Sequence, residues 1–230
     1  LSKIVDKIAI SFEDTKKYFN SRKTILTGCP CHMKRQEITK EELLAKFHLE
    51  PNRFTILVFG GSRGSHRINE EFLKAAPLLK DDLTFQVIHI VGEHDYDTLK
   101  EKYKNLTIPF CLFRFLDEIE NAYLVADLVI SRAGAVTICE IAMFQLPAIL
   151  IPYPFAGGHQ RENAKVLCDL GTAAMIDEKD LSTQKLKDEI LRMAKNGMPN
   201  NRMRGRLTDF YFSDAATRLT NEITALKIKK

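Results

Sequence analysis

The first residues whose types and spacing could bind a ligand form a glycine-rich segment, Gly60-Gly61-Ser62-Arg63-Gly64-Ser65. The loop follows a short apolar run, Thr55 to Phe59, and precedes apolar residues at helical spacing, which predicts a strand, a loop and a helix in direct succession. Amides and the positive end of a helix dipole would then face an approaching anion, with Gly61, Ser62 and Gly64 as candidate ligands. A diphosphate would suit this loop. The alternative is a tight turn that binds nothing.

A second element of the same kind runs from Arg132 to Glu140 and again joins an apolar run to a helix. Arg132, Gly134 and Ala135 stand at the predicted helix start, where a second anion-binding position would form. Glu140 falls about two turns into that helix, and its carboxylate could accept hydrogen bonds from two ribose hydroxyls. The alternative for Glu140 is an ordinary solvated helix residue.

A third element is the loop 152–158, rich in proline and glycine, followed by His159, Gln160 and Asn163 in the first turn of another predicted helix. Their neutral donors and acceptors suit sugar hydroxyls. The alternative is a plain helix cap at His159 and Gln160.

Asp95-Tyr96-Asp97 resembles the Asp-x-Asp pair with which some sugar transferases hold a divalent ion. Asp is also a favoured residue before a helix, and two amide-rich loops make a metal clamp redundant. We therefore interpret Asp95 as a helix cap and predict no metal site.

These elements need a scaffold, and the apolar pattern predicts one. Apolar runs alternate with segments of helical periodicity of about ten residues, which is typical of a doubly wound α/β fold with a parallel sheet. Predicted strands cover 55–59, 85–91, 110–115, 128–131, 148–151 and 173–176, and predicted helices cover 68–79, 96–103, 118–125, 135–144, 160–170 and 183–194. Ligands of such folds bind at the carboxyl ends of the strands, where all three loops would lie.

Composition limits the class of protein. The chain has 230 residues, 45% of them hydrophobic and 28% charged, which excludes intrinsic disorder. The net charge of +4 does not indicate nucleic acid as a partner. The longest apolar run is too short to span a bilayer, and the N-terminus lacks the layout of a secretory signal. An odd number of cysteines, 5, fits free thiols in a reducing compartment.

The N-terminal region does not fit the repeating pattern. Segments 7–12 and 23–27 read as strands that cannot bury themselves alone. We therefore predict the remnant of a preceding domain over 1–28, a linker over 29–53 with a helix at 41–47, the main domain over 54–198, and a helical tail over 199–230 that bends near residue 213.

Four ordered motifs together resemble the MurG family of bacterial transferases. They are Gly60-Gly61-Ser62-Arg63-Gly64-Ser65, Phe115-Leu116-Asp117-Glu118-Ile119, the segment from Ala126 to Ala135, and His159-Gln160-Arg161-Glu162-Asn163-Ala164. The resemblance implies the second, donor-binding domain of a two-domain GT-B fold. It also implies an inverting hexosyltransferase that moves GlcNAc from UDP-GlcNAc to undecaprenyl-diphosphate-MurNAc-pentapeptide (lipid I to lipid II) in peptidoglycan synthesis, and thus a part in cell-wall growth, cell shape and division.

The same resemblance implies roles for single residues. Ser62 and the amides of Gly61 and Gly64 would hold the diphosphate, the backbone near Leu116 would meet the uracil, and Glu140 would bind the ribose. His159 and Gln160 would bind the GlcNAc hydroxyls. The family needs no metal or cofactor, and no catalytic base is assigned in this chain.

The chain also departs from the family pattern. In Thr27-Gly28-Cys29-Pro30, Cys29 replaces the usual Asn, and His32 stands where the family has an Arg near the diphosphate. The acceptor would bind the missing N-terminal domain, which would also meet the inner face of the cytoplasmic membrane. We therefore expect this chain to bind donor better than it catalyses.

Three alternatives remain at this point. One is a nucleotide-sugar-binding module without activity of its own, and another is the catalytic half of a split UDP-GlcNAc transferase. An NAD-dependent oxidoreductase would suit the fold class but lacks the G-x-G-x-x-G pattern after the first strand.

Overall fold

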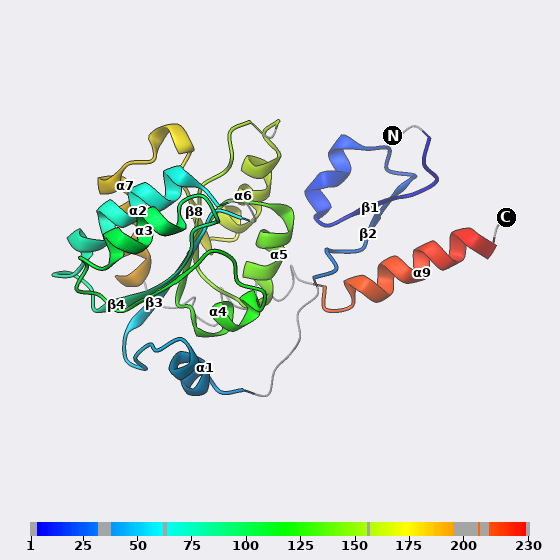
Figure 1. Cartoon of the computed structure of the whole chain (residues 1–230). Coiled ribbons are helices and arrows are strands. Elements are labelled where there is room, and N and C mark those ends of the chain that lie inside the picture. The colour runs from blue at the N-terminus through cyan, green and yellow to red at the C-terminus, as the bar shows by residue number, and fades with distance from the viewer. Residues whose placement is uncertain are drawn as a thin grey trace.

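The structure is a computed structural model that describes residues 4–31, 38–61, 64–155, 157–195, 207 and 212–228. Strands and helices alternate through its main part, as the sequence pattern predicts (Figure 1). The strands there are β3 (Phe54–Phe59), β4 (Phe85–Ile90), β5 (Phe110–Phe113), β6 (Leu128–Ser131), β7 (Ala148–Leu150) and β8 (Ala173–Met175). The helices are α2 (His66–Leu79), α3 (Tyr96–Tyr103), α4 (Ile119–Val125), α5 (Ala135–Met143), α6 (His159–Asp169) and α7 (Thr183–Lys195), with a 3-10 turn, η2 (Glu178–Asp180).

These strands form one parallel sheet in the order β5-β4-β3-β6-β7-β8. Strands β4 and β5 are added in turn on one side of β3, and β6, β7 and β8 are then added in turn on its other side. This is the strand order of a doubly wound nucleotide-binding fold, and the point where the direction reverses lies between β3 and β6. The predicted fold class is confirmed.

The strands are largely apolar on both faces because both faces of the sheet are covered. Ile56, Leu57 and Val58 of β3 are fully buried. Ile56 and Val58 pack with α2 and α7, whereas Leu57 packs with α1 (Lys40–Lys46), α4, α5 and α6. Successive side chains of a strand point to opposite faces, so a continuous apolar run is what a sheet between two helical layers requires.

The N-terminal segment forms a separate small sheet. Strand β1 (Ile8–Ile10) pairs in parallel with β2 (Thr24–Leu26), and a 3-10 helix, η1 (Glu13–Tyr18), connects them. The sequence predicts both strands but not η1, whose apolar content is too low to show a period. In Figure 1 this sheet lies beside α9 (Ala215–Ile228), at a distance from the main sheet.

Helix α9 covers the part of the predicted tail helix that the structure describes after residue 211. It begins directly after Ser213 and Asp214, where a bend was predicted. Glu222 of this helix forms an ion pair with Lys7 at 3.9 Å, and Phe212 lies against Gly28. The N-terminal sheet and the C-terminal helix are therefore neighbours.

Helix α1 lies inside the segment predicted as a linker. A capping box between Thr39 and Glu42 starts the helix, and Leu43 and Leu44 are buried in the same cluster as α4 and α5. Part of the segment 29–53 thus packs on the main sheet. The domain limits themselves stay a prediction.

Candidate functional site

The loops after β3, β6 and β7 enclose a cavity of about 420 Å³ at the carboxyl edge of the sheet, here called the central cavity. The loops meet because β3 pairs with β6 and β6 with β7, and Phe59, Ser131 and Leu150 stand in register at their ends. The lining residues are Gly60, Gly61, Gly64, Arg132, Gly134, Thr137, Tyr153 and Gln160. Residues predicted from all three sequence elements therefore meet in one place.

The glycines of the first loop are required by its path. A Cβ on Gly60 would stand 2.2 Å from the backbone nitrogen of Ser65, and a Cβ on Gly64 would stand 2.3 Å from the carbonyl oxygen of Val91. Gly64 also has a φ of +73°, and Gly61 a φ of +88°, which L side chains rarely adopt. The loop can approach the sheet edge this closely only with glycine, and it leaves Gly61 facing open space.

Two helices begin at the central cavity without the usual partners for their first amides. Neither Ser65, the N-cap of α2, nor Gly134, the N-cap of α5, makes a side-chain cap hydrogen bond, and neither first turn carries an acidic residue. Helix α1, away from the cavity, has a full capping box and acidic residues instead. Free amides and two positive helix ends make the central cavity favourable for an anion with two charges.

Arg132 lies in the wall of the central cavity, but its charge is already paired. Its guanidinium forms an ion pair with Glu178 and donates to the Ser65 hydroxyl at 2.8 Å. It also donates to the carbonyl oxygens of Ile151 and Pro152 at 3.3 and 3.4 Å. Arg132 therefore joins the first loop, the third loop and η2, and its predicted contact with the donor stays a prediction.

Gln160 and Asn163 hold the second loop in place. The Gln160 Oε1 atom accepts hydrogen bonds from the backbone amides of Ala133 at 3.1 Å and Tyr153 at 2.9 Å. The Asn163 amide donates to the Ala133 carbonyl oxygen at 3.1 Å. These contacts give both side chains a positioning role that the sequence did not predict.

His159 and Asn163 line a neighbouring cavity of about 540 Å³ rather than the central one. Thr15, Tyr18 and Phe19, at η1 and just after it, form its other side. The predicted sugar-binding residues therefore lie in two different cavities, since Gln160 lines the central cavity. The part played by η1 was missed because residues 13–19 carry no motif.

Glu140 lies one turn beyond Thr137 on α5 and is partly buried. The Tyr123 hydroxyl donates a hydrogen bond of 2.9 Å to its Oε2 atom. Burial raises the pKa of Glu140 above its ordinary value, and the nearby charges of Cys29 and Glu120 act in the same direction. Glu140, the residue predicted to bind the ribose, is thus positioned by the hydroxyl of the buried Tyr123.

The remaining predicted residues have different positions. Leu116 follows β5 and is partly buried against the core, while Ala135 is exposed at the start of α5. Ser62 and His32 lie outside the described residues, so their predicted contacts stay predictions.

Thr137 and Tyr153 line the central cavity and were not among the predicted residues. Thr137 stands three residues after Gly134, and that spacing on a helix start was an available signal. Tyr153 belongs to the third loop, whose prolines and glycines indicate a backbone shape but give no sign of which side chain faces a cavity.

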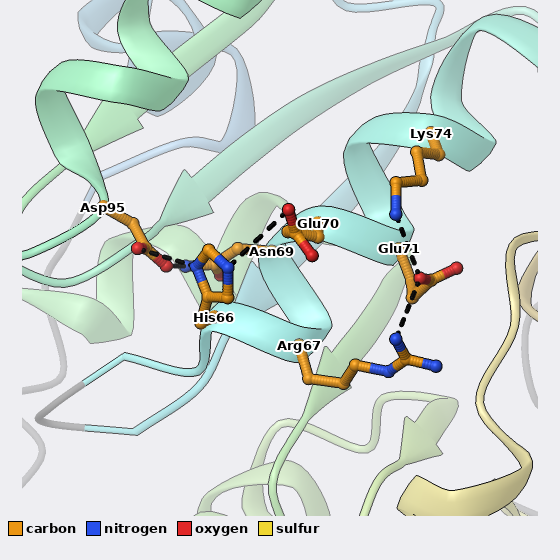
Figure 2. Close-up of polar contacts among 7 residues, drawn as sticks. All are labelled: His66, Arg67, Asn69, Glu70, Glu71, Lys74 and Asp95. Carbon is orange, nitrogen blue, oxygen red and sulfur yellow. Dashed lines mark hydrogen bonds and ion pairs between the residues drawn. The ribbon is translucent and has the colours of Figure 1, made fainter.

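Asp95 occupies the N-cap position of α3, as predicted, but its side chain makes no cap hydrogen bond. Its carboxylate instead pairs with His66 at 3.0 Å and accepts from Asn69 at 2.8 Å (Figure 2). Asp97 pairs with Arg114 at 2.8 Å. The two carboxylates are thus committed to different partners.

Among the residues that the structure describes, no helix combines the length and apolar character that crossing a membrane requires. No set of three or more His, Cys, Asp or Glu side chains there has the arrangement of a metal site.

Residues 55–219 match the family described as glycosyltransferase family 28 C-terminal domain. A relative from Thermodesulfovibrio yellowstonii is 39% identical over 83% of this chain and 52% of its own length. A relative from Syntrophus aciditrophicus is 41% identical over 83% of this chain and 52% of its own length. A relative from Thermoanaerobacter is 35% identical over 98% of this chain and 63% of its own length. All three are named UDP-N-acetylglucosamine--N-acetylmuramyl-(pentapeptide) pyrophosphoryl-undecaprenol N-acetylglucosamine transferase. The chain spans about half the length of the first two.

Solved structures agree on the fold. The crystal structure of Acinetobacter baumannii MurG superimposes with a TM-score of 0.72 at 22% identity, over 97% of this chain and 61% of that one. The calicheamicin glycosyltransferase CalG4 gives a TM-score of 0.65 at 14% identity, over 96% of this chain and 54% of that one. The prediction of a GT-B second domain is confirmed. With the family match over 55–219, this shows that the chain belongs to the glycosyltransferase family 28 C-terminal domain family.

Proposed function

We propose that this chain is the donor-binding part of an inverting transferase that moves GlcNAc from UDP-GlcNAc to undecaprenyl-diphosphate-MurNAc-pentapeptide. The name that the relatives described above share supplies the substrates. The site residues would be those of the central cavity together with Glu140, Leu116, His159 and Asn163. The observation that carries the proposal is the pair of uncapped, acid-free helix starts of α2 and α5 at that cavity.

The proposed chemistry follows from where charge develops. As the bond from the anomeric carbon to the diphosphate breaks, negative charge grows on the departing UDP. The fixed amides of Gly61 and of the two helix starts would stabilise that charge without reorganising, which is the electrostatic route to catalysis. These amides would make a metal ion unnecessary for the leaving group. The Gly64 amide instead donates to the Gly61 carbonyl oxygen at 2.9 Å and so holds the turn in shape. A base must remove the proton of the acceptor hydroxyl, and none is assigned in this chain.

The wider setting is part of the same proposal. The acceptor would bind a preceding domain, of which residues 1–28 would be the last piece, and residues 29–53 would link it to the donor domain. The whole enzyme would work in the cytoplasm at the inner face of the membrane, because its acceptor carries an undecaprenyl chain. No cofactor would take part.

Val136 gives a sharp test of the anion site. It is 53% exposed in the first turn of α5, so its substitution leaves the core intact. Val136→Glu places a carboxylate where it complements the helix dipole but repels a diphosphate. We expect the thermal midpoint to stay equal or rise, while UDP-GlcNAc binding by calorimetry weakens by about tenfold or more.

Val136→Gln is the matched control, since it has the same shape without the charge, and it should bind nearly as the unchanged chain does. UDP and UDP-glucose serve as comparison ligands. The proposal fails if the unchanged chain gives no binding heat at millimolar UDP-GlcNAc. It also fails if Val136→Glu binds as well as Val136→Gln.

A further inference from the structure

Three thiols meet where the segment after β2 passes helix α5. Cys29 and Cys31 come from that segment and Cys139 from α5. The thiol of Cys139 is in hydrogen-bond contact with those of Cys29 and Cys31, which also contact each other. All three are free cysteines, and they pack on one hydrophobic cluster. Residues far apart in the sequence thus bring their sulfur atoms together.

The backbone around these thiols holds them in place. The amides of Thr27 and Gly28 donate to the Ile10 carbonyl oxygen at 3.1 and 3.3 Å, which fixes the segment to β1. Gly28 has a φ of +77° and packs against Phe212, where an added Cβ would come within 2.8 Å. Cys29 therefore has little freedom to swing away from Cys139.

The thiols differ in reactivity. Hydrogen bonds from Cys139 and then Cys31 lower the pKa of Cys29 far below that of an ordinary thiol, and Cys29 is partly exposed. Burial raises the pKa of Cys111 and of Cys168 to about 11. Because the thiolate is the nucleophile, Cys29 is primed to react while Cys111 and Cys168 are protected.

We propose that Cys29 and Cys139 form a peroxide-sensitive thiol pair that closes to a disulfide joining the segment after β2 to helix α5. The Cys29 thiolate attacks hydrogen peroxide, the O–O bond breaks, and Cys29 sulfenic acid and hydroxide form. The Cys139 thiol then attacks that sulfur, the S–O bond breaks, and a disulfide and water result. The two thiols lose two electrons, which the peroxide takes up. The proposal concerns thiol chemistry alone and stands or falls without the proposed function.

Cys139 is the partner we assign, rather than Cys31, for a geometric reason. Cys29 and Cys31 are separated by Pro30 alone, so a disulfide between them would close a very small ring around a residue with fixed φ. Cys139 comes from a distant part of the chain and contacts both. A disulfide between Cys29 and Cys139 therefore closes no small strained ring.

The test treats the reduced full chain with hydrogen peroxide at neutral pH, blocks the remaining thiols with iodoacetamide, and maps the peptides by mass spectrometry. We expect a Cys29–Cys139 crosslink that a thiol reductant reverses, with Cys111 and Cys168 still alkylated. In Cys139→Ser we expect Cys29 sulfenic acid, trapped by dimedone at least about tenfold faster than any product at Cys111 or Cys168. Cys168→Ser is the matched control and should keep the crosslink.

Three results would overturn the proposal. One is peroxide reacting first at Cys111 or Cys168, another is a disulfide confined to Cys29 and Cys31, and the third is an unchanged thiol count. If Cys139→Ser does not fold, which its thermal midpoint would show, the peptide map of the unchanged chain decides the question alone.

Discussion

The Tyr123 hydroxyl donates a hydrogen bond of 2.9 Å to Glu140 Oε2, and this contact fixes the carboxylate that we assign to the ribose. Tyr123 is 1% exposed and stacks on Phe144 with ring centroids 5.1 Å apart. The phenol is therefore a rigid support rather than a mobile surface group. Its action on a ligand would pass through Glu140.

Removing that support should weaken donor binding without unfolding the chain. Tyr123→Phe keeps the stacked ring and deletes the hydroxyl, so we expect UDP-GlcNAc affinity to fall about three- to tenfold in calorimetry. Glu140→Ala should cost more, because it removes the carboxylate that we assign to the ribose. If Tyr123 acts only through Glu140, Tyr123→Phe should change nothing in a Glu140→Ala background. A further loss of affinity in that background would contradict the positioning role.

Donor affinity should also depend on pH through Glu140. Its pKa is raised, chiefly by burial, and only the ionised carboxylate can accept hydrogen bonds from both ribose hydroxyls. Affinity should be full at neutral pH and fall on acidification, starting at a higher pH than an ordinary carboxyl would cause. Calorimetry with UDP-GlcNAc from neutral pH downward measures this, since its diphosphate does not titrate in that range. Glu140→Gln should give a flat profile, and a fall of equal size in that variant would refute the assignment.

The fully buried His89 predicts a pH dependence of stability. Its Nε2 donates to Asn69 Oδ1 at 3.0 Å. Because burial keeps the ring neutral, its Nδ1 accepts from the Tyr103 hydroxyl at 2.8 Å. Burial lowers its pKa to about 3. In the unfolded chain the ring would take up a proton near its ordinary pKa of about 6.5.

The native chain therefore binds fewer protons than the unfolded one between those two pKa values. Stability is complete above the higher pKa and falls as pH decreases, by up to about 1.4 kcal/mol per pH unit from this group. Urea unfolding at several pH values should show that His89→Gln removes this slope. His94→Gln, at an exposed histidine, should keep it. Equal slopes in the two variants would show that His89 does not cause the effect.

The glycine loop allows a paired test of sterics. Gly64→Ala meets the Val91 carbonyl oxygen at 2.3 Å in a conformation with positive φ, so it should cost roughly 3 kcal/mol or more of unfolding free energy. Gly61→Ala has the same sign of φ but open space around it, and should cost about 1–2 kcal/mol. Thermal or urea unfolding compares the two. Equal costs would mean that the contact with Val91 relaxes.

Arg132 and Glu178 should behave as a coupled pair. Their side chains are 11% and 23% exposed, so removing one partner leaves a poorly solvated charge. Arg132→Met should destabilise the chain by about 2–3 kcal/mol, below the range for a fully buried pair because Glu178 is partly exposed. Adding Glu178→Gln should recover part of that loss in a double-mutant cycle. Additive losses would show that Arg132 acts mainly through Ser65 and the carbonyl groups.

The scaffold was predictable from the sequence, and the reason is physical. A run such as Phe54–Phe59 is apolar on both faces, and the loops that follow such strands in a parallel sheet must meet at one edge. The same logic placed Gly61, Gly64, Arg132 and Gln160 together.

What the sequence could not supply were contacts between distant polar groups. Nothing near Arg132 in the chain points to Glu178, and no local pattern brings Tyr123 to Glu140 or η1 to His159. Asp95 shows the converse. Its local pattern predicted a cap, but His66 and Asn69 from another helix take its carboxylate. Such pairings depend on how helices pack across the sheet, which one-dimensional spacing does not encode.

The contact between Gly28 and Phe212 has a mechanical consequence. The polypeptide passes from the small N-terminal sheet to the main sheet after Gly28, and Leu207, buried in the main core, is only a few residues before Phe212, which packs on Gly28. The polypeptide therefore joins the two parts twice, and the two connections touch at Gly28 and Phe212. A side chain at position 28 would have to displace Phe212, because an added Cβ there stands 2.8 Å from the Phe212 ring. The glycine thus sets how closely the N-terminal sheet and the start of α9 can approach each other.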